Sequence, residues 1–247
     1  MSTPANEPTG RGSTRSAVVW SGLEGVLHGD PLDVLDIGGG TGGLAVRVGL
    51  LGHRVTVVDP SPDALAALDR RAREHDVAVT GSQGDLSSLL DVVGPDSADL
   101  VLCHGVLEVV DDPVAALATL GRVVRPGGVL SLLVAQRYAA VVARAMAGHF
   151  QQALAMLDPS TGSGHRTSQG RVGRRYTHDE LAVLVRDAGL TVDAVHGIRV
   201  FTDLVPGSLL DLEPGATAAL VELEQAVATR PEYLPLATQL HLLAHRP

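Results

Sequence analysis

The stretch LDVLDIGGGTGGLAVRVGLLGHRVTVVDP, residues 32–60, decides the fold of this chain. It begins with a near-continuous apolar run, Leu32 to Ile37, which enters the glycine-rich turn GGGTGG and then the helical stretch Leu44 to Leu51. A second apolar run, Arg54 to Val58, follows and is closed by Asp59-Pro60. A strand, a glycine turn, a helix and a second strand in this order predict the beginning of a parallel α/β sheet.

The same alternation continues beyond residue 60. The segment Ser61 to His75 reads as a helix, because Ser61 can cap it and Pro62 suits its first turn. Apolar strands that alternate with amphipathic helices imply a sheet covered on both faces. The further elements that we expect are strands at Val77–Thr80, Ala98–Cys103 and Gly128–Ala135 and a helix at Pro113–Val124.

The two ends of the chain depart from this pattern. Residues 1–13 are rich in Ser, Thr, Pro and Gly, so we expect a mobile N-terminal segment before a first helix at Ala17–Leu27. Residues 158–175 (DPSTGSGHRTSQGRVGRR) read as a basic loop insertion. A helix at Asp179–Ala188 and strands near Thr191–His196 and Gln239–His245 then predict an antiparallel addition to the sheet. One domain over residues 14–247 is the simplest account.

Composition excludes several classes of protein. The single cysteine, Cys103, rules out a disulfide framework and a Cys-rich zinc site, and we predict no bound metal. No apolar run approaches the roughly 20 residues that span a bilayer, and the polar N-terminus lacks a signal peptide, so we expect a cytoplasmic protein. The formal net charge is −9 and aromatic residues make up 2%, which is unfavourable for wrapping extended nucleic acid. A nucleic-acid partner must therefore be met by a local basic patch.

Acidic residues around the glycine turn indicate the kind of ligand. Asp36 stands two residues before the first glycine, which gives D-x-G-x-G-x-G rather than the dinucleotide pattern G-x-G-x-x-G. Asp59 ends the second strand, where it can accept hydrogen bonds from ribose hydroxyls, and Asp85 follows the third strand, where an adenine edge would lie. This combination resembles the class I S-adenosylmethionine (SAM) methyltransferases. Two alternatives stay open: a tight turn without a ligand, and an NAD-dependent oxidoreductase, for which no substrate acid or base is evident.

Five further stretches carry a closer resemblance: HGVLEVVDDP (104–113), RVVRPGGVLSLL (122–133), MAGHF (146–150), GIRVFTD (197–203) and LVELE (220–224). From about Arg11 to the C-terminus, the chain resembles the bacterial tRNA 5-carboxymethoxyuridine methyltransferases, which esterify the carboxylate of a modified wobble uridine. The resemblance implies a Rossmann-like fold with a mainly parallel seven-stranded sheet. It also implies SAM as the cofactor, S-adenosylhomocysteine as the product and tRNA as the partner.

The resemblance and the motif together indicate the site residues. Arg15 matches an arginine that contacts the cofactor's carboxylate, and His104 matches a histidine that lines the SAM site. Arg199 matches an arginine suited to holding the substrate carboxylate. No residue stands out as a catalytic acid or base. The predicted cofactor site comprises Arg15, Asp36, Gly38, Gly39, Gly40, Gly42, Asp59, Gln83, Gly84, Asp85 and His104, and the predicted substrate and tRNA site comprises Arg166, Arg171, Arg174, Arg175 and Arg199.

Some positions depart from the family pattern. The family's N-terminal tyrosine is missing, its aromatic-Tyr-Asn sequence is replaced by Val134-Ala135-Gln136, and its Lys-rich stretch is an Arg-containing loop of different length. Two other functions therefore stay open. One is a SAM methyltransferase for a small carboxylate, amine or hydroxyl compound, which a closed apolar pocket behind Tyr138 and Phe150 would favour. The other is a SAM-binding protein without catalysis.

The key side chains also have structural readings. Arg15 could pair with or cap the first helix, and His104 could be a satisfied histidine at a strand end. Arg199 falls in an apolar run that we expect to be a strand, where it could form a buried ion pair. The arginines of residues 158–175 could belong to a solvated loop. For Glu108 we leave open a place beside the active site or a role as a cap of the following turn.

Overall fold

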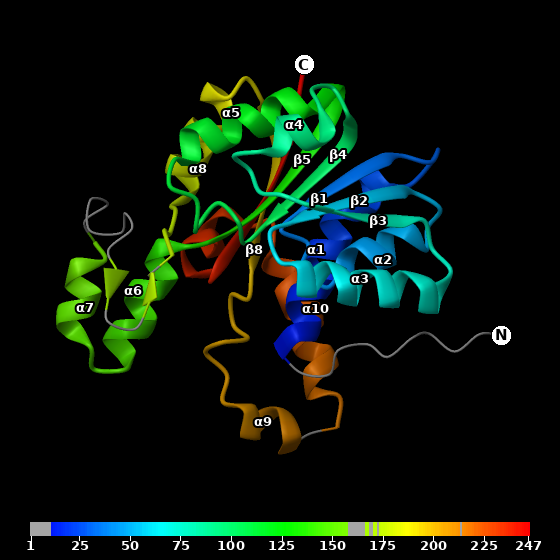
Figure 1. Ribbon diagram of the computed structural model, residues 1–247. Coiled ribbons are helices and arrows are strands. Elements are labelled where there is room, and N and C mark those ends of the chain that lie inside the picture. Colours follow the sequence, from blue (N-terminus) through cyan, green and yellow to red (C-terminus); the bar gives the residue numbers. More distant parts are fainter. Residues whose placement is uncertain (1–10, 158–165, 168–169, 172, 213) are drawn as a thin grey trace.

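The computed structural model describes residues 11–157, 166–167, 170–171, 173–212 and 214–247. In this part of the chain, seven strands form one sheet in the order β3-β2-β1-β4-β5-β9-β8 (Figure 1). The strands are β1 (Asp33–Ile37), β2 (Arg54–Asp59), β3 (Val79–Gln83), β4 (Ala98–His104), β5 (Val124–Ala135), β8 (Thr191–Ile198) and β9 (Gln239–His245). β1 to β5 run parallel, whereas β9 is antiparallel to both β5 and β8. The predicted mainly parallel sheet with an antiparallel addition is confirmed.

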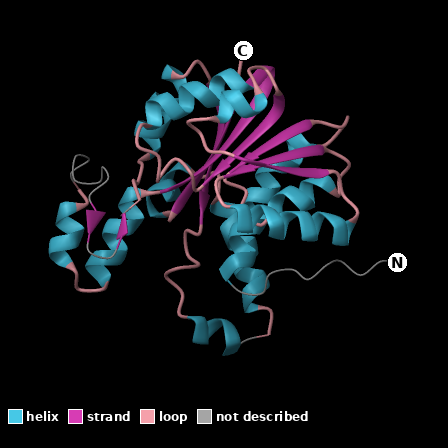
Figure 2. Cartoon of the chain, viewed as in Figure 1, coloured by secondary structure: helices cyan, strands magenta, loops and turns pink. Residues whose placement is uncertain are grey.

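Helices cover both faces of the sheet (Figure 2). One face carries α4 (Leu89–Val93), α5 (Pro113–Val123) and α8 (His178–Asp187), and the other carries α1 (Arg11–Leu27), α2 (Gly43–Gly49), α3 (Pro62–His75) and α10 (Ala216–Val227). Each face has its own hydrophobic cluster; Leu117 and Leu181 lie in one, and Leu23 and Leu68 in the other. Because the central strands are buried on both sides, their sequences read as continuous apolar runs.

Local signals place the ends of several helices. The Ser61 side chain accepts a hydrogen bond from the Ala64 N–H, and Pro62 opens α3 as the sequence predicts. The helix ends at Asp76, which adopts the left-handed conformation. At α8 a reciprocal capping box joins Thr177 and Glu180, so this helix begins one residue before the predicted start.

Three predicted boundaries differ from the structure by three residues or more. β3 begins at Val79 and continues to Gln83, because residues 81–83, which read as a glycine turn, extend the pairing with β2. β5 begins at Val124 and includes the RPGG sequence, at which the pairing with β4 shifts register. α1 begins at Arg11, so residues 11–13 are helical and not part of a mobile segment. Residues 1–10 lie outside the described part of the chain.

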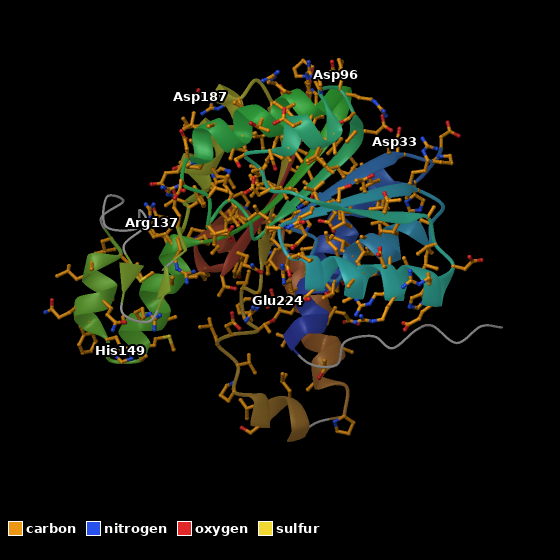
Figure 3. All side chains as sticks on the ribbon, in the orientation of Figure 1. Asp33, Asp96, Arg137, His149, Asp187 and Glu224 are labelled. Carbon is orange, nitrogen blue, oxygen red and sulfur yellow. The ribbon has the colours of Figure 1, made fainter. Side chains whose placement is uncertain are left out.

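The sequence did not reveal several elements after β5, among them α10 and the helices of residues 137–155. α6 (Arg137–Met146) and α7 (Phe150–Ala155) form an arm that projects from the body (Figure 1). Figure 3 labels Arg137 at the base of this arm and His149 between its two helices. α9 (Gly207–Leu212) and the 3₁₀ helix η2 (Pro231–Leu236) lie between β8 and β9 in sequence. Among the helices described, none is long and apolar enough to cross a membrane.

Candidate active site

The glycine-rich turn between β1 and α2 is enclosed by protein on one side and open on the other. Gly40 has φ +56°, and a Cβ added there would meet nothing within 4 Å. A Cβ on Gly39 would lie 2.5 Å from Oδ2 of Asp36, and Gly38 and Gly42 are enclosed as tightly by other side chains. Close packing of the turn therefore requires Gly38, Gly39 and Gly42, whereas Gly40 fronts open space.

Two carboxyl groups lie beside this turn, at the ends of β1 and β2. Asp59 is 7% exposed; its Oδ2 accepts from the Gly40 N–H at 2.9 Å and its Oδ1 from the Ser61 N–H at 2.9 Å. These bonds fix the carboxylate and leave lone pairs for hydroxyl donors. Burial, and then the charge of Asp59, raise the pKa of Asp36 to about 7. A positively charged ligand beside these two groups would relieve the cost of ionising Asp36.

The residues predicted around the adenine lie at the end of the next strand. The Gly84 N–H donates to the Asp59 carbonyl oxygen at 3.3 Å, so this segment runs beside the end of β2. Gln83 is exposed. Asp85 is also exposed, and the hydrogen bond from the Ser87 hydroxyl at 2.6 Å lowers the pKa of its carboxyl group. The fold brings all the acidic residues of the predicted cofactor site to one edge of the sheet.

His104 ends β4 and belongs to a buried polar group that the sequence did not reveal. Its Nε2 lies 2.8 Å from Ser131 Oγ on β5, which in turn lies 2.8 Å from Nε2 of His241 on β9. The His241 ring stacks on His196 of β8 with centroids 5.4 Å apart. Burial, and then the charge of Arg15, lower the pKa of His104 to about 3, and burial lowers the pKa of the other two histidines. At neutral pH the three imidazoles are uncharged.

Arg15 lies near enough to Arg199 and to His104 for its charge to interact with both residues. Burial, and then the positive charge of Arg199, lower the pKa of Arg15, while Glu108 acts in the opposite direction. Two half-buried guanidinium groups that repel each other favour an anionic ligand between or beside them. This pair is the main electrostatic feature of the candidate site.

The predicted place of Arg199 within a strand is wrong. β8 ends at Ile198, and Arg199 follows it in the left-handed conformation with φ +59°. Its Nη2 donates to Oδ1 of Asp203, which is the structural ion pair considered from the sequence. Its Nε is buried and has no partner among the described residues. The side chain thus retains hydrogen-bonding capacity beyond the ion pair.

Glu108 connects the arginine pair to the segment before α8. Its Oε1 accepts from the Ala135 N–H at 2.8 Å, its Oε2 is buried without a partner in the described chain, and burial raises the pKa of its carboxyl group. Its carbonyl oxygen accepts from the Arg174 N–H at 2.8 Å. Glu108 therefore lies near Arg15 and Arg175, and its carboxyl group also accepts a hydrogen bond from its own backbone, so both readings considered from the sequence have contacts in the structure.

Arg174 and Arg175 are half-buried against this loop and are not part of a solvated connection. Arg174 Nη1 and Arg175 Nε are buried atoms that lack partners among the described residues. Burial, and then the charge of Arg144 on α6, lower the pKa of Arg175. We call Arg199, Arg15, Arg175 and Arg144 the basic path: Arg15 interacts with Arg199, Arg175 interacts with Arg144 on the arm, and the charge of Glu108 acts on both Arg15 and Arg175.

Other predicted residues of the substrate side are less defined. Arg166 and Arg171 face each other in the short ladder of β6 (Arg166–Thr167) and β7 (Gly170–Arg171), and their side chains lie outside the described part of the chain. Tyr138 and Phe150 are 47% and 69% exposed. Tyr138 lines a cavity together with residues such as Gln136 and Leu234, and Phe150 is not among its lining residues, so the two aromatic side chains do not share the pocket that would favour a small-molecule acceptor.

Comparison with known proteins agrees with this geometry. A family model described as a methyltransferase domain matches residues 35–130, which include the glycine turn, Asp59, Asp85 and His104. Fold, site and this match define a SAM-dependent methyltransferase with the class I Rossmann-like fold. The chain is therefore an enzyme, a methyltransferase, and its cofactor is SAM.

Particular relatives refine the comparison. The chain is 29% identical, over 97% of its own length and 90% of the relative's, to the tRNA 5-carboxymethoxyuridine methyltransferase of Escherichia coli (strain K12). It is 34% identical to a ubiquinone biosynthesis O-methyltransferase of Xanthomonas euvesicatoria pv. vesicatoria (strain 85-10), over 67% of this chain and 65% of that protein. The crystal structure of Burkholderia thailandensis 1,6-didemethyltoxoflavin-N1-methyltransferase with bound S-adenosylhomocysteine superimposes with a TM-score of 0.60 at 22% identity, covering 96% of this chain and 79% of that chain.

Proposed function

We propose that this methyltransferase esterifies the carboxylate of a 5-carboxymethoxyuridine-type wobble nucleoside in tRNA. The observation that carries the proposal is the pair of half-buried guanidinium groups, Arg15 and Arg199, whose charges interact. SAM has a carboxylate of its own, so an enzyme that methylates an acceptor carboxylate brings two anionic groups into one site, where two cationic groups can bind them. We further propose that residues 14–247 act as one methyltransferase domain in the cytoplasm.

In this proposal the first half of the chain holds SAM. The Asp59 carboxylate accepts hydrogen bonds from the ribose hydroxyls, residues 83–85 lie around the adenine, and the open space at Gly40 admits the cofactor. Arg15 holds the cofactor's carboxylate, and the buried carboxyl group of Asp36 balances the positive charge of the cofactor. When bound, SAM supplies a methyl group on a sulfonium leaving group. The residues present fit such a ligand in charge and in hydrogen-bonding capacity.

Methylation of a carboxylate requires that the protein orient the acceptor, and it does not require a proton transfer. A carboxylic acid has a pKa near 4, so the acceptor is already ionised at neutral pH and requires no general base. His104, with a pKa of about 3, stays neutral and does not compete for the acceptor as a cation. Arg199 orients the carboxylate through paired hydrogen bonds, and placing the two reacting atoms about 3 Å apart supplies most of the rate enhancement.

The basic path supports tRNA over a small acceptor. It extends from Arg199 and Arg15 through Arg175 to Arg144 on the arm. The segment from Arg137 to Leu157 contains no acidic residue, although the whole chain carries a net charge of −9. A series of cationic side chains in an acidic protein matches a polyanion that reaches beyond the reacting group.

The test is mass spectrometry of tRNA nucleosides from cells with and without this protein. We expect the methyl ester of a carboxymethoxyuridine to disappear when the gene is deleted and to return when the gene is restored. An unchanged nucleoside profile would contradict the proposal and favour a small acceptor, for which the similarity to a ubiquinone biosynthesis O-methyltransferase provides the alternative.

The first prediction concerns the cofactor. Asp59→Ala is expected to weaken binding of S-adenosylhomocysteine by about 1–3 kcal/mol, because charge-assisted hydrogen bonds to the ribose are lost. Isothermal titration calorimetry measures the change, with Asp69→Ala, an exposed position on α3, as the matched control. Unchanged affinity in the Asp59 variant would remove this residue from the cofactor site.

The second prediction concerns Arg175 of the basic path and its neighbour Arg174. Arg174→Ala combined with Arg175→Ala is expected to weaken tRNA binding and to flatten its dependence on salt, because fewer counterions are released. Filter binding over a series of salt concentrations measures both quantities. Arg70→Ala with Arg73→Ala, on the exposed side of α3, is the matched control. Equal affinity and equal salt slope in both double variants would show that the two arginines do not meet tRNA.

A further inference from the structure

Glu224 is a fully buried carboxylate on α10 that none of the catalytic arguments above uses. Its Oε2 accepts from the Val200 N–H at 2.8 Å, and its Oε1 accepts from the Phe201 and Thr202 N–H groups at 2.9 and 2.8 Å. The Thr202 hydroxyl donates to the same Oε1 at 2.6 Å. All four donors belong to the turn that follows Arg199, and Figure 3 shows Glu224 inside the body of the molecule, below the sheet.

This turn needs an external anchor. Arg199 carries a side chain in the left-handed conformation, with φ +59°, which non-glycine residues disfavour. Three successive N–H groups after it lie beyond the end of β8 and have no strand partner, so a buried acceptor must satisfy them. Glu224 supplies that acceptor, and the Thr238 N–H donates to the Arg199 carbonyl oxygen at 3.4 Å. The backbone is held on both sides of the Arg199 side chain.

The anchor connects two stretches that lie far apart in the sequence. GIRVFTD provides Arg199 and the donors, and LVELE provides the carboxylate. α10 packs against α1, which carries Arg15. α10 thus contacts α1, which carries Arg15, and also the turn that follows Arg199.

We infer that Glu224 is a positioning residue of methyl transfer, which holds the turn of residues 199–203 so that Arg199 meets the acceptor carboxylate. The inference rests on the proposed function for the role of Arg199. A carboxylate suits this place because both oxygens accept, whereas a carboxamide would turn an NH₂ group toward a backbone N–H. Glu224 touches neither substrate nor cofactor in this account and acts through the turn.

The test compares Glu224→Gln, Arg199→Ala and the double variant with the parent protein. Glu222→Gln is the matched control, because Glu222 is an exposed carboxylate on the same helix. Transfer of the methyl group is measured with labelled SAM and tRNA that carries 5-carboxymethoxyuridine, and cofactor binding is measured by calorimetry with S-adenosylhomocysteine. Hydrogen exchange reports whether the N–H groups of residues 200–202 are protected.

For Glu224→Gln we expect faster exchange at residues 200–202, cofactor affinity within about twofold of the parent, and kcat/KM for tRNA lower by 10-fold or more. The double variant should lose little beyond Arg199→Ala alone, because both changes remove the same interaction; a merely structural role would make the losses additive. Glu222→Gln should match the parent in every measurement.

The outcomes separate this inference from the proposed function. If Arg199→Ala lowers transfer but Glu224→Gln does not, or if the two losses add, the positioning role is overturned and the proposed function stands. If the parent protein methylates no tRNA, the proposed function fails, and the positioning role falls with it. Should Glu224→Gln not fold, Thr202→Val removes one of the four hydrogen bonds and keeps the carboxylate; undiminished transfer and unchanged exchange in that variant would overturn the inference.

Discussion

Arg199→Ala is expected to leave S-adenosylhomocysteine binding nearly unchanged while methyl transfer falls by roughly 10²-fold or more. Arg199 is the member of the arginine pair that we assign to the acceptor, and its buried Nε has no partner in the described chain. A planar guanidinium can hold a carboxylate by two parallel hydrogen bonds and fix its orientation, and positioning supplies most of the catalysis in this reaction. Calorimetry and a methyl-transfer assay measure the two quantities separately.

Two comparisons sharpen this prediction. Arg199→Lys should restore little activity, because an ammonium group cannot hold the plane of the carboxylate. Arg186→Ala, at an exposed position on α8, is the matched control and should behave as the parent. Parent-level transfer in the Arg199→Ala variant would remove the residue from the acceptor site. Loss of folding would instead assign the Arg199–Asp203 ion pair a structural role.

Asp36→Asn is expected to stabilise the cofactor-free protein in a pH-dependent way. The folded protein holds the pKa of Asp36 at about 7, above the ordinary value of 3.8. The unfolded chain therefore loses this proton first, and the stability of the parent falls as pH rises from 3.8 to about 7. A rise of this size corresponds to roughly 4 kcal/mol. The new side chain cannot ionise, so the free energy of unfolding of the variant should exceed that of the parent by roughly that amount at pH 8 and by about 1–2 kcal/mol at pH 5.

Urea unfolding at the two pH values measures this difference. Asp69→Asn, at an exposed position on α3, should change stability little at either pH. A gain that is the same at pH 5 and pH 8 would contradict an elevated pKa and would point to packing at the glycine turn instead. Addition of SAM should reduce the difference in free energy of unfolding between variant and parent, since a positive ligand stabilises the ionised form of Asp36.

The cofactor half of the site could be predicted because its signals are local. A buried strand, a glycine turn and a helix follow one another without interruption, and parallel strands bring Asp36, Asp59 and Asp85 to the same edge. The end of β3 was placed less well, because Gly81 in the middle of a strand reads as a turn. Pairing with β2, which is a tertiary effect, outweighs that local preference.

The acceptor half depends on contacts between distant residues, which one sequence does not reveal. Glu224 reads as a solvent-facing charge on a helix, and its burial makes sense only with the donors of residues 200–202. Arg199 reads as part of an apolar strand because the left-handed turn has no glycine to mark it. The two helices of the arm were not predicted, because their large apolar side chains do not mark the buried face: Met146 and Phe150 are 71% and 69% exposed, whereas the buried positions are Ala139 and Ala153.

The hydroxyl of Ser131 has one proton, and this fixes the tautomers of the histidines on either side of it. Ser131 Oγ contacts Nε2 of both His104 and His241, so it donates to one ring and accepts from the other. The Nδ1 of His241 is buried with no partner in the described chain. If the single N–H of this neutral ring were on Nδ1, it would therefore be a buried donor without an acceptor, which is costly. His241 therefore carries its proton on Nε2 and donates to Ser131, which donates to His104. His104 then keeps its own proton on Nδ1, so the free side of its ring is a hydrogen-bond donor and not a base.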